Sequence, residues 1–222
     1  MPYSVKILMT EFVTRDVKRF ITEKPAGFVY TPGQATDVAV NLPELKDKTR
    51  PFTFTSLNSD LVLEFTIKSY PDHGGVTKKL HELKPGDELL ISDPWGTIHY
   101  KDRGVFIAGG AGITPFIAIF RDLYQKGKLA GNKLFFSNKT EQDIIIKQEL
   151  EYIFPAGDLI LTLTQEQNPK YQSARINKDF LKKYLTDFSQ NFYLCGPPPM
   201  IKDLKADLAV LGASVDQIIF EK

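Results

Sequence analysis

A glycine-rich turn between an apolar strand and a helix is the first stretch of the sequence with residue types suited to chemistry. Residues 105–108 have the composition of a buried strand, and residues 109–112, which include three glycines, follow with little side-chain bulk. Thr114 is suited to cap the following helix, and Pro115 to its first turn, where a missing N–H costs nothing. The free N–H groups and the helix dipole of such a turn favour an anion, so the stretch predicts either a phosphate site or an ordinary tight turn.

The spacing of these glycines meets the dinucleotide-binding fingerprint only in part. In Gly110-x-Gly112-x-x-Pro115, proline stands where the third small residue belongs. The next apolar strand, at residues 133–136, is followed by no acidic residue placed to hold a ribose. The sequence therefore favours a phosphate site of a different type from the standard dinucleotide site.

A second turn of similar composition lies in the first half of the chain. Gly74 and Gly75 let backbone amides approach a phosphate, and Thr77 adds a hydroxyl donor at the start of an expected helix. A plain glycine loop between a strand and a helix is the alternative. Two phosphate turns, one in a β-rich segment and one in an α/β segment, suggest a protein that binds two nucleotides.

Composition and charge argue against several classes of protein. A net charge of +1 over 222 residues argues against general binding to nucleic acid or to a membrane surface. The single cysteine, Cys195, excludes an internal disulfide and a four-cysteine iron–sulfur centre within this chain. The three histidines lack the spacing of metal ligands, so we expect no metal. With no evident signal peptide and no apolar stretch long enough to cross a bilayer, we expect a cytoplasmic protein. We also expect the protein to be a monomer.

Two kinds of secondary-structure pattern must position these turns. Up to about residue 100 the chain has short runs of β-branched or alternating apolar residues, separated by proline and glycine turn signals, as is typical of a small antiparallel β barrel. The expected strands there are residues 5–7, 17–20, 38–40, 61–67 and 88–91, and the expected helix is residues 76–83.

From Gly104 onward the pattern alternates between strand and helix, which predicts a five-stranded parallel sheet covered on both faces. We place the boundary near Asp102, so that residues 1–101 form the barrel domain and residues 102–222 the α/β domain. The expected strands are residues 105–108, 133–136, 159–163, 191–194 and 217–220, and the expected helices are residues 116–123, 143–154, 178–185 and 198–211.

Four stretches with residue types suited to nucleotide binding follow one another along the chain: Arg50-Pro51-Phe52-Thr53, Gly74-Gly75-Val76-Thr77, Gly109-Gly110-Ala111-Gly112-Ile113-Thr114-Pro115 and Cys195-Gly196-Pro197-Pro198. In these motifs and their order the chain resembles the ferredoxin–NADP reductase family over nearly its whole length. Residues 140–143 are among the stretches that support the resemblance. The resemblance implies a β barrel that binds FAD, rather than FMN, followed by an α/β domain that binds NADH or NADPH.

The resemblance also implies an activity. Hydride would pass from the nicotinamide to the flavin, and single electrons would then leave for a separate carrier, because the chain has no iron–sulfur ligands of its own. Flavodoxin or ferredoxin is the first expectation for that carrier, followed by an oxygenase component or a ferric chelate. A module that binds flavin or nucleotide without turnover is the alternative from another class.

Within the barrel, the resemblance assigns roles to the first motif. Arg50 would bind a flavin phosphate, and Phe52 would lie flat against the isoalloxazine ring, although the family's tyrosine hydroxyl is absent. Thr53 would reach flavin N5. A surface arginine, a core aromatic and a strand threonine are the ordinary uses of the same residues. The other flavin-binding residues expected are Pro51, Ile67, Lys68, Gly74, Gly75, Val76 and Thr77.

In the α/β domain, Cys195 would lie beside the nicotinamide ring, where a small polarizable side chain leaves room for the ring. It is not expected to act as a nucleophile, and a buried inert cysteine is the alternative. Glu221 matches the family's acidic residue close to the flavin, and an exposed terminal carboxylate is its alternative. The other nucleotide-binding residues expected are Gly110, Gly112, Thr114, Pro115, Gln165, Arg175, Gly196 and Pro197.

The choice between NADH and NADPH is expected to depend on the residues after the strand at 159–163. Family members that use NADPH often have an arginine there, after a serine or threonine, to bind the 2′-phosphate. Here Thr164 is followed by Gln165 and Glu166, and an acidic residue would repel a phosphate. Arg175 and Lys170 are able to supply positive charge from the following loop. The sequence therefore leans towards NADH.

Overall fold

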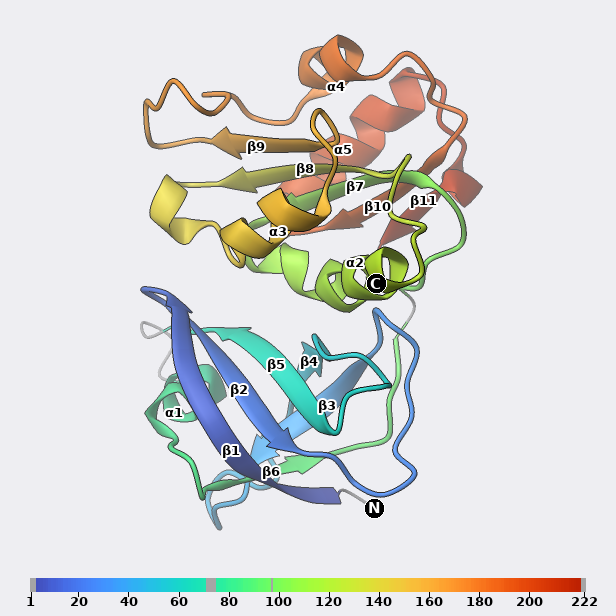
Figure 1. Ribbon diagram of the computed structural model, residues 1–222. Helices are drawn as coiled ribbons and strands as arrows, with labels where there is room; N and C mark the ends of the chain where they lie inside the picture. Colours follow the sequence, from blue (N-terminus) through green and yellow to red (C-terminus); the bar gives the residue numbers. More distant parts are fainter. Residues whose placement is uncertain (1–2, 71–74, 97, 221–222) are drawn as a thin grey trace. The chain divides into compact units, whose positions relative to one another are not determined.

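The computed structural model describes residues 3–70, 75–96 and 98–220, and the chain divides into two compact units (Figure 1). The first unit comprises residues 1–99 together with residues 114–122, and the second comprises residues 100–113 together with residues 123–222. The division after residue 99 lies close to the expected boundary near Asp102. Domains of 1–101 and 102–222 remain our proposal for the parts that fold as units.

The first unit contains an antiparallel sheet of six strands in the order β4-β3-β6-β1-β2-β5. Beyond β4, Phe54 forms a β-bridge with Phe65, and the Thr55 N–H donates to the Glu64 carbonyl oxygen at 2.8 Å, so the two edge strands meet. This arrangement confirms the expected barrel. The strands are β1 (Tyr3–Thr14), β2 (Val17–Glu23), β3 (Ala35–Val40), β4 (Arg50–Thr53), β5 (Val62–Lys68) and β6 (Glu88–Ile91).

The barrel encloses an apolar core to which one helix, α1 (Val76–Glu82), contributes Val76 and Leu80. The C-terminal end of α1 is held by Lys18, whose ammonium group donates to the carbonyl oxygens of His81 at 3.1 Å and Leu83 at 2.7 Å. These bonds satisfy acceptors that the end of a helix leaves open. The largest buried side chains of the core include Phe20, Phe54, Phe65, Ile7 and Leu63.

Two strands differ from expectation. Strand β1 extends to Thr14 and not only over residues 5–7, because the register shifts between Ile7 and Met9 and breaks the alternation of apolar residues. Strand β4 was not expected. It is a four-residue edge strand that pairs with β3 alone in the sheet, and its first two residues are exposed, so it carries no alternating pattern.

The second unit contains a parallel sheet of five strands in the order β11-β10-β7-β8-β9, as expected. On one face, α4 and α5 bury Phe180, Leu181, Leu204 and Leu208 against sheet residues such as Phe135. The strands are β7 (Gly104–Gly109), β8 (Lys133–Asn138), β9 (Leu159–Leu163), β10 (Asn191–Cys195) and β11 (Ile218–Phe220), and the helices of the α/β segment are α2 (Thr114–Gln125), α3 (Lys147–Ile153), α4 (Lys178–Tyr184) and α5 (Pro198–Val210).

The helix expected over residues 143–154 is shorter, and α3 begins at Lys147. A 3₁₀ turn (Glu141–Asp143) precedes it, because Thr140 and Asp143 form a capping box that closes this turn by itself. Ile146 then has a φ of 47°, a left-handed conformation that separates the turn from the helix. Thr114 is likewise the first residue of α2 and not its cap, since a 3₁₀ turn (Gly110–Ile113) leads directly into the helix.

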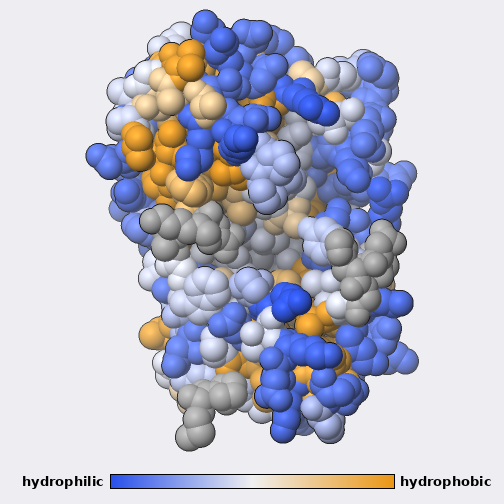
Figure 2. Space-filling view, turned by 180° about the vertical axis from the view of Figure 1, so that it is seen from behind, coloured by the Kyte–Doolittle hydropathy of each residue, from blue (hydrophilic) through white to orange (hydrophobic). Residues whose placement is uncertain are grey.

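Polar side chains cover most of the face shown in Figure 2, with apolar areas between them. Some large apolar residues, such as Phe12 and Val29, are exposed, as is common on the surface of folded proteins. Among the residues described, no helix combines the length and the hydropathy that crossing a membrane requires.

Candidate functional site

The glycine-rich turn after β7 has two glycines that are required for different reasons. Gly110 has a φ of 53°, and a Cβ placed on it would meet nothing within 4 Å. A Cβ on Gly112 would instead lie 2.3 Å from the carbonyl oxygen of Cys195, which is impossible without a shift of the backbone. Gly110 thus leaves open space beside the turn, and Gly112 lets the turn lie directly against the backbone at the end of β10.

The place of this turn in the sheet is the one at which open α/β sheets bind ligands. β7 and β10 are hydrogen-bonded neighbours, with Ala108 paired to Cys195, and the strand order reverses between them. β8 and β9 extend the sheet on one side and β11 on the other, and open α/β sheets commonly bind ligands outside the carboxyl ends of strands at such a reversal. The second unit thus brings the predicted residue Gly112 together with Cys195 and Gly196.

A buried tyrosine of β10 connects this strand to β7 and to the chain just before it. Cys195 is its last residue and is half-buried, and Pro197 directly precedes α5. Tyr193 is fully buried and lies against Phe106, with ring centroids 4.3 Å apart. Its hydroxyl accepts the Lys101 N–H at 3.0 Å and donates to the Asp102 carbonyl oxygen at 2.7 Å. The approach to β7 is therefore tied to β10 within the same unit.

A pocket of about 410 Å³ lies beyond the carboxyl end of β9. Both residues expected to select the nucleotide, Gln165 and Arg175, line it, and so does Glu166. Glu166 is half-buried, and its Oε2 accepts the main-chain N–H of Glu141 at 2.8 Å. The full lining is Leu163, Thr164, Gln165, Glu166, Gln167, Ser173, Ala174 and Arg175.

The first flavin motif forms strand β4. Arg50 and Pro51 are exposed, and the Arg50 guanidinium donates to the neighbouring Thr49 carbonyl oxygen at 2.7 Å, so its charge stays at the surface. Phe52 is half-buried and packs against the barrel core, and Thr53 is 8% exposed. Arg50 is placed to meet an anion from solvent, whereas part of the Phe52 side chain is committed to the core.

The remaining expected flavin residues have mixed surroundings. Ile67 is 1% exposed in the barrel core, and Lys68 pairs with Asp16 at 2.9 Å. Gly75 directly precedes α1, where Val76 is buried and Thr77 follows in the first turn. Two of the expected residues, Gly74 and Glu221, lie outside the described residues.

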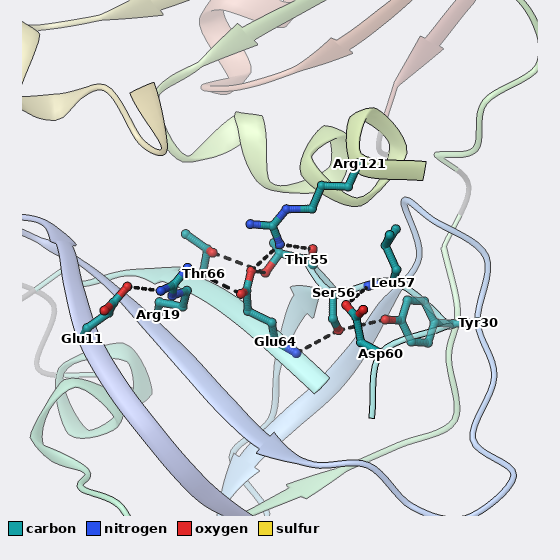
Figure 3. Close-up of polar contacts among 10 residues, drawn as sticks. All are labelled: Glu11, Arg19, Tyr30, Thr55, Ser56, Leu57, Asp60, Glu64, Thr66 and Arg121. Carbon is teal, nitrogen blue, oxygen red and sulfur yellow. Dashed lines mark hydrogen bonds and ion pairs between the residues drawn. The ribbon is translucent and has the colours of Figure 1, made fainter. Parts of the chain in front are cut away.

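Sequence reasoning did not single out a polar network on the outer side of β5, drawn in Figure 3. Glu64 is only 8% exposed, and its Oε1 accepts hydrogen bonds from the Arg121 guanidinium at 2.7 Å and from the Thr55 hydroxyl at 2.8 Å. Arg121 also donates to the Thr55 carbonyl oxygen at 2.7 Å, and an Arg19 nitrogen lies 3.8 Å from Glu64. Arg121 belongs to the segment of α2 that groups with the barrel.

The same network continues towards the loop before β5. The Ser56 hydroxyl accepts the Glu64 N–H at 2.9 Å and is 2.8 Å from the Tyr30 hydroxyl. Burial raises the pKa of Tyr30 to about 12, so its hydroxyl stays protonated at neutral pH. An alternating strand suggests that Glu64 points to solvent, and no local signal indicates that α2 covers it.

Two domain families match the chain in succession. The model of the oxidoreductase FAD-binding domain matches residues 4–100, and that of the oxidoreductase NAD-binding domain matches residues 106–206. NADH-cytochrome b5 reductase 1 of Kluyveromyces lactis is 32% identical over 197 residues, which cover 81% of this chain and 68% of that protein. The reductase component of propane 2-monooxygenase from Rhodococcus jostii is 26% identical over 234 residues, 98% of this chain and 62% of that protein.

Solved structures agree on the fold. The FAD/NAD-binding domain of a nitric oxide dioxygenase from Vibrio cholerae has a TM-score of 0.87 at 21% identity and covers 98% of this chain and 97% of its own. A ferredoxin NADP+ reductase from Neisseria gonorrhoeae, solved with FAD and NADP, has a TM-score of 0.83 at 22% identity, with 99% and 98% covered. The order of a barrel and a five-stranded parallel sheet is thus shared with these proteins.

Proposed function

Because the chain belongs to the ferredoxin–NADP reductase-like family of FAD- and NAD-binding oxidoreductases, we propose that it takes hydride from NADH and delivers electrons singly to a separate carrier protein. It is an NAD(P)H-dependent flavoprotein reductase. The observation that carries the proposal is the meeting of two turns, Gly110 to Gly112 and Cys195 to Gly196, at the point where the strand order of the parallel sheet reverses.

The residues present fit both cofactors. Open space beside Gly110, whose left-handed φ only glycine adopts readily, leaves the main chain of the turn accessible to a pyrophosphate. On the barrel, the exposed guanidinium of Arg50 offers a planar pair of donors to a flavin phosphate. Bound flavin supplies the ability to accept two electrons as hydride and release them one at a time.

The work of the chain is to bind and orient. Gly112 permits the close contact that holds the phosphate turn against β10, and Cys195 ends that strand with a small side chain. In the proposal, Cys195 leaves room for the nicotinamide ring and Thr53 offers a hydroxyl to the flavin. Orientation of this kind supplies much of the rate in a reaction between two bound cofactors.

The proposal also covers the class of protein that accepts the electrons. Curated relatives of the chain are named as NADH-cytochrome b5 reductases and as the reductase component of a propane monooxygenase. These names favour a small haem protein or an oxygenase component as the acceptor over the flavodoxin or ferredoxin that the motifs first suggest. Reduction of the carriers by the NADH-reduced protein, followed by stopped flow, ranks these classes directly.

The primary test is the colour of the protein and its response to NADH. We expect the purified chain to carry FAD, to be yellow, and to be bleached by NADH under anaerobic conditions. A colourless protein that takes up neither FAD nor FMN on titration would contradict flavin binding. A flavin that NADH and NADPH both fail to reduce would indicate a binding module without turnover.

Substitution of Cys195 and Thr53 tests their proposed roles. Cys195→Ala and Thr53→Ala are each expected to slow flavin reduction about tenfold, equivalent to ~1.4 kcal/mol of transition-state stabilisation, while FAD stays bound. Stopped-flow absorbance of the flavin gives this rate. Thr10→Ala, a half-buried threonine of β1 without an assigned role, is the control. Equal rates in all variants would return both residues to a structural role.

A further inference from the structure

The pocket beyond β9 has a wall whose two ends are fixed by the sheet. This wall is the loop of residues 164–173, and the Leu163 N–H donates to the Gln172 carbonyl oxygen at 2.9 Å, which closes the loop on itself. At its first end, the Thr164 and Gln165 N–H groups donate to the carbonyl oxygens of Asn138 at 3.0 Å and Lys139 at 2.9 Å. Among the residues that the structure describes, the main chain of the middle of the loop, residues 166–171, makes no such hydrogen bond to a strand.

Glu141 supports this part of the loop from the turn before α3. Its Oε1 accepts hydrogen bonds from the Lys147 ammonium at 2.6 Å and from the Tyr171 hydroxyl at 2.7 Å. Its Oε2 accepts one from the Asn168 side-chain amide at 3.0 Å. The Lys147 ammonium also lies 5.6 Å from the centre of the Tyr171 ring. The bonds from Lys147 and Tyr171 lower the pKa of Glu141, so a charged carboxylate lies between the turn and the loop.

Glu141, through its main chain, and Asn168, through its side chain, also hold Glu166, the acidic residue of the pocket lining. Glu166 accepts the main-chain N–H of Glu141 on Oε2 at 2.8 Å and the Asn168 amide on Oε1 at 3.3 Å. An ionised carboxylate has about four lone-pair positions, so two positions remain for further donors. Glu166 is therefore oriented by its neighbours and still able to accept hydrogen bonds from a ligand in the pocket.

The distance across the sheet suggests which part of a ligand reaches this pocket. β9 is two strands away from β7, or about 10 Å at the usual strand spacing. If a nucleotide has its pyrophosphate at the turn after β7, the pocket beyond β9 is within reach of its adenosine half. There the two hydroxyls of a ribose would donate to Glu166, whereas a 2′-phosphate would be repelled by it. Arg175, on the same lining, acts in the opposite direction by attracting a phosphate.

We propose that Glu141 is a positioning residue for nucleotide selection: by holding the 164–173 loop and Glu166, it makes the pocket favour a free ribose diol over a 2′-phosphate. This inference rests on the proposed function, since it requires that the chain bind a nicotinamide nucleotide. The proposed role of Glu141 in positioning the pocket loop is not evident from its place in the turn at residues 140–143.

The test compares the binding of NAD+ and NADP+ to the flavin-loaded protein by calorimetry, without turnover. In Glu166→Gln we expect the ratio of the two dissociation constants to move about tenfold in favour of NADP+, because one negative charge near the 2′-phosphate is lost. In Glu141→Gln we expect a shift in the same direction of at least about threefold. Tyr171→Phe removes a single hydrogen bond to Glu141 and changes no charge. It is therefore expected to shift the ratio of dissociation constants in the same direction by a smaller factor.

A double-mutant cycle separates positioning from general support of the structure. If Glu141 acts through Glu166, then Glu141→Gln has no further effect on the ratio once Glu166 is glutamine. Glu151→Gln is the matched control, because Glu151 also lies 3.7 Å from Lys147 and the charge change is identical. That control is expected to leave the ratio unchanged.

Three results would overturn the inference. Equal weakening of both nucleotides in Glu141→Gln and Tyr171→Phe, with an unchanged ratio, would make Glu141 a structural residue only. If Glu141→Gln changes the ratio of dissociation constants by the same factor in the Glu166→Gln protein as in the wild type, Glu141 does not act through Glu166. A shift of the same size in Glu151→Gln would assign the effect to net charge. A wild-type protein that binds neither nucleotide contradicts the proposed function itself.

Discussion

Replacing Arg121 with methionine is expected to lower the free energy of unfolding by about 3 kcal/mol. The substitution leaves the Glu64 carboxylate, which is 8% exposed, without its closest cation, and an uncompensated buried charge is strongly destabilising. Arg19, at 3.8 Å, remains as the more distant partner. Urea denaturation of the flavin-loaded protein, followed by circular dichroism, measures the change.

Two further variants decide whether the buried charge is the cause. Arg121→Met combined with Glu64→Leu removes both charges and is expected to recover most of the lost stability, since apolar pairs often replace buried ion pairs at no net cost. Lys79→Met breaks the exposed pair with Glu82 and is expected to leave the free energy of unfolding unchanged within error. A single Arg121→Met variant as stable as the wild type would show that Glu64 is solvated or protonated instead.

Replacing Gly112 with alanine is expected to reduce kcat/KM for NADH about a hundredfold while FAD remains bound. The added Cβ would lie 2.3 Å from the Cys195 carbonyl oxygen, so the turn must move away from the end of β10. A displacement of about 1 Å is enough to cost about 10²-fold when it misplaces a bound reactant. Steady-state kinetics and the affinity for NAD+ together measure the effect.

The control for this variant is another glycine with a different environment. Gly127 also has a positive φ, of 64°, but a Cβ there would meet nothing within 4 Å. Gly127→Ala is therefore expected to cost about 1 kcal/mol in stability from backbone strain, with no loss of affinity for NAD+. An unchanged kcat/KM in Gly112→Ala would mean that the turn after β7 is not at the nucleotide site.

Local patterns in the sequence were sufficient for most of the fold. Strand β9 has the bounds expected for it, and the glycine and proline signals near Gly110 and Pro198 mark the starts of helices. These features depend on a few neighbouring residues, through alternation, helical spacing and turn preferences, so they can be read without knowledge of the rest of the chain. The succession of β-rich and alternating segments then indicated both sheets and their parallel or antiparallel character.

Residues of the candidate site were predictable to different degrees. The glycine-rich turn and Cys195 were identified by type and order, and the structure places Gly112 against Cys195 as neighbouring strands require. Arg50 is exposed at β4 and Thr53 is buried there, yet β4 itself was not expected because an exposed edge strand has no apolar alternation. The exact start of α3 also escaped local reasoning, since the capping box of Thr140 and the left-handed Ile146 divide one periodic stretch in two.

Only the tertiary structure decided which polar side chains meet. Arg121 and Glu64 are 57 residues apart, and Tyr171 and Glu141 are 30 residues apart, so no spacing rule relates them. The order of the parallel strands, with β7 in the centre and a reversal between β7 and β10, likewise depends on the path of a crossover and not on any single segment. Local residue types therefore determined the elements and the turns, whereas long-range packing determined that Glu64 is buried and that Glu141 supports the loop of the pocket beyond β9.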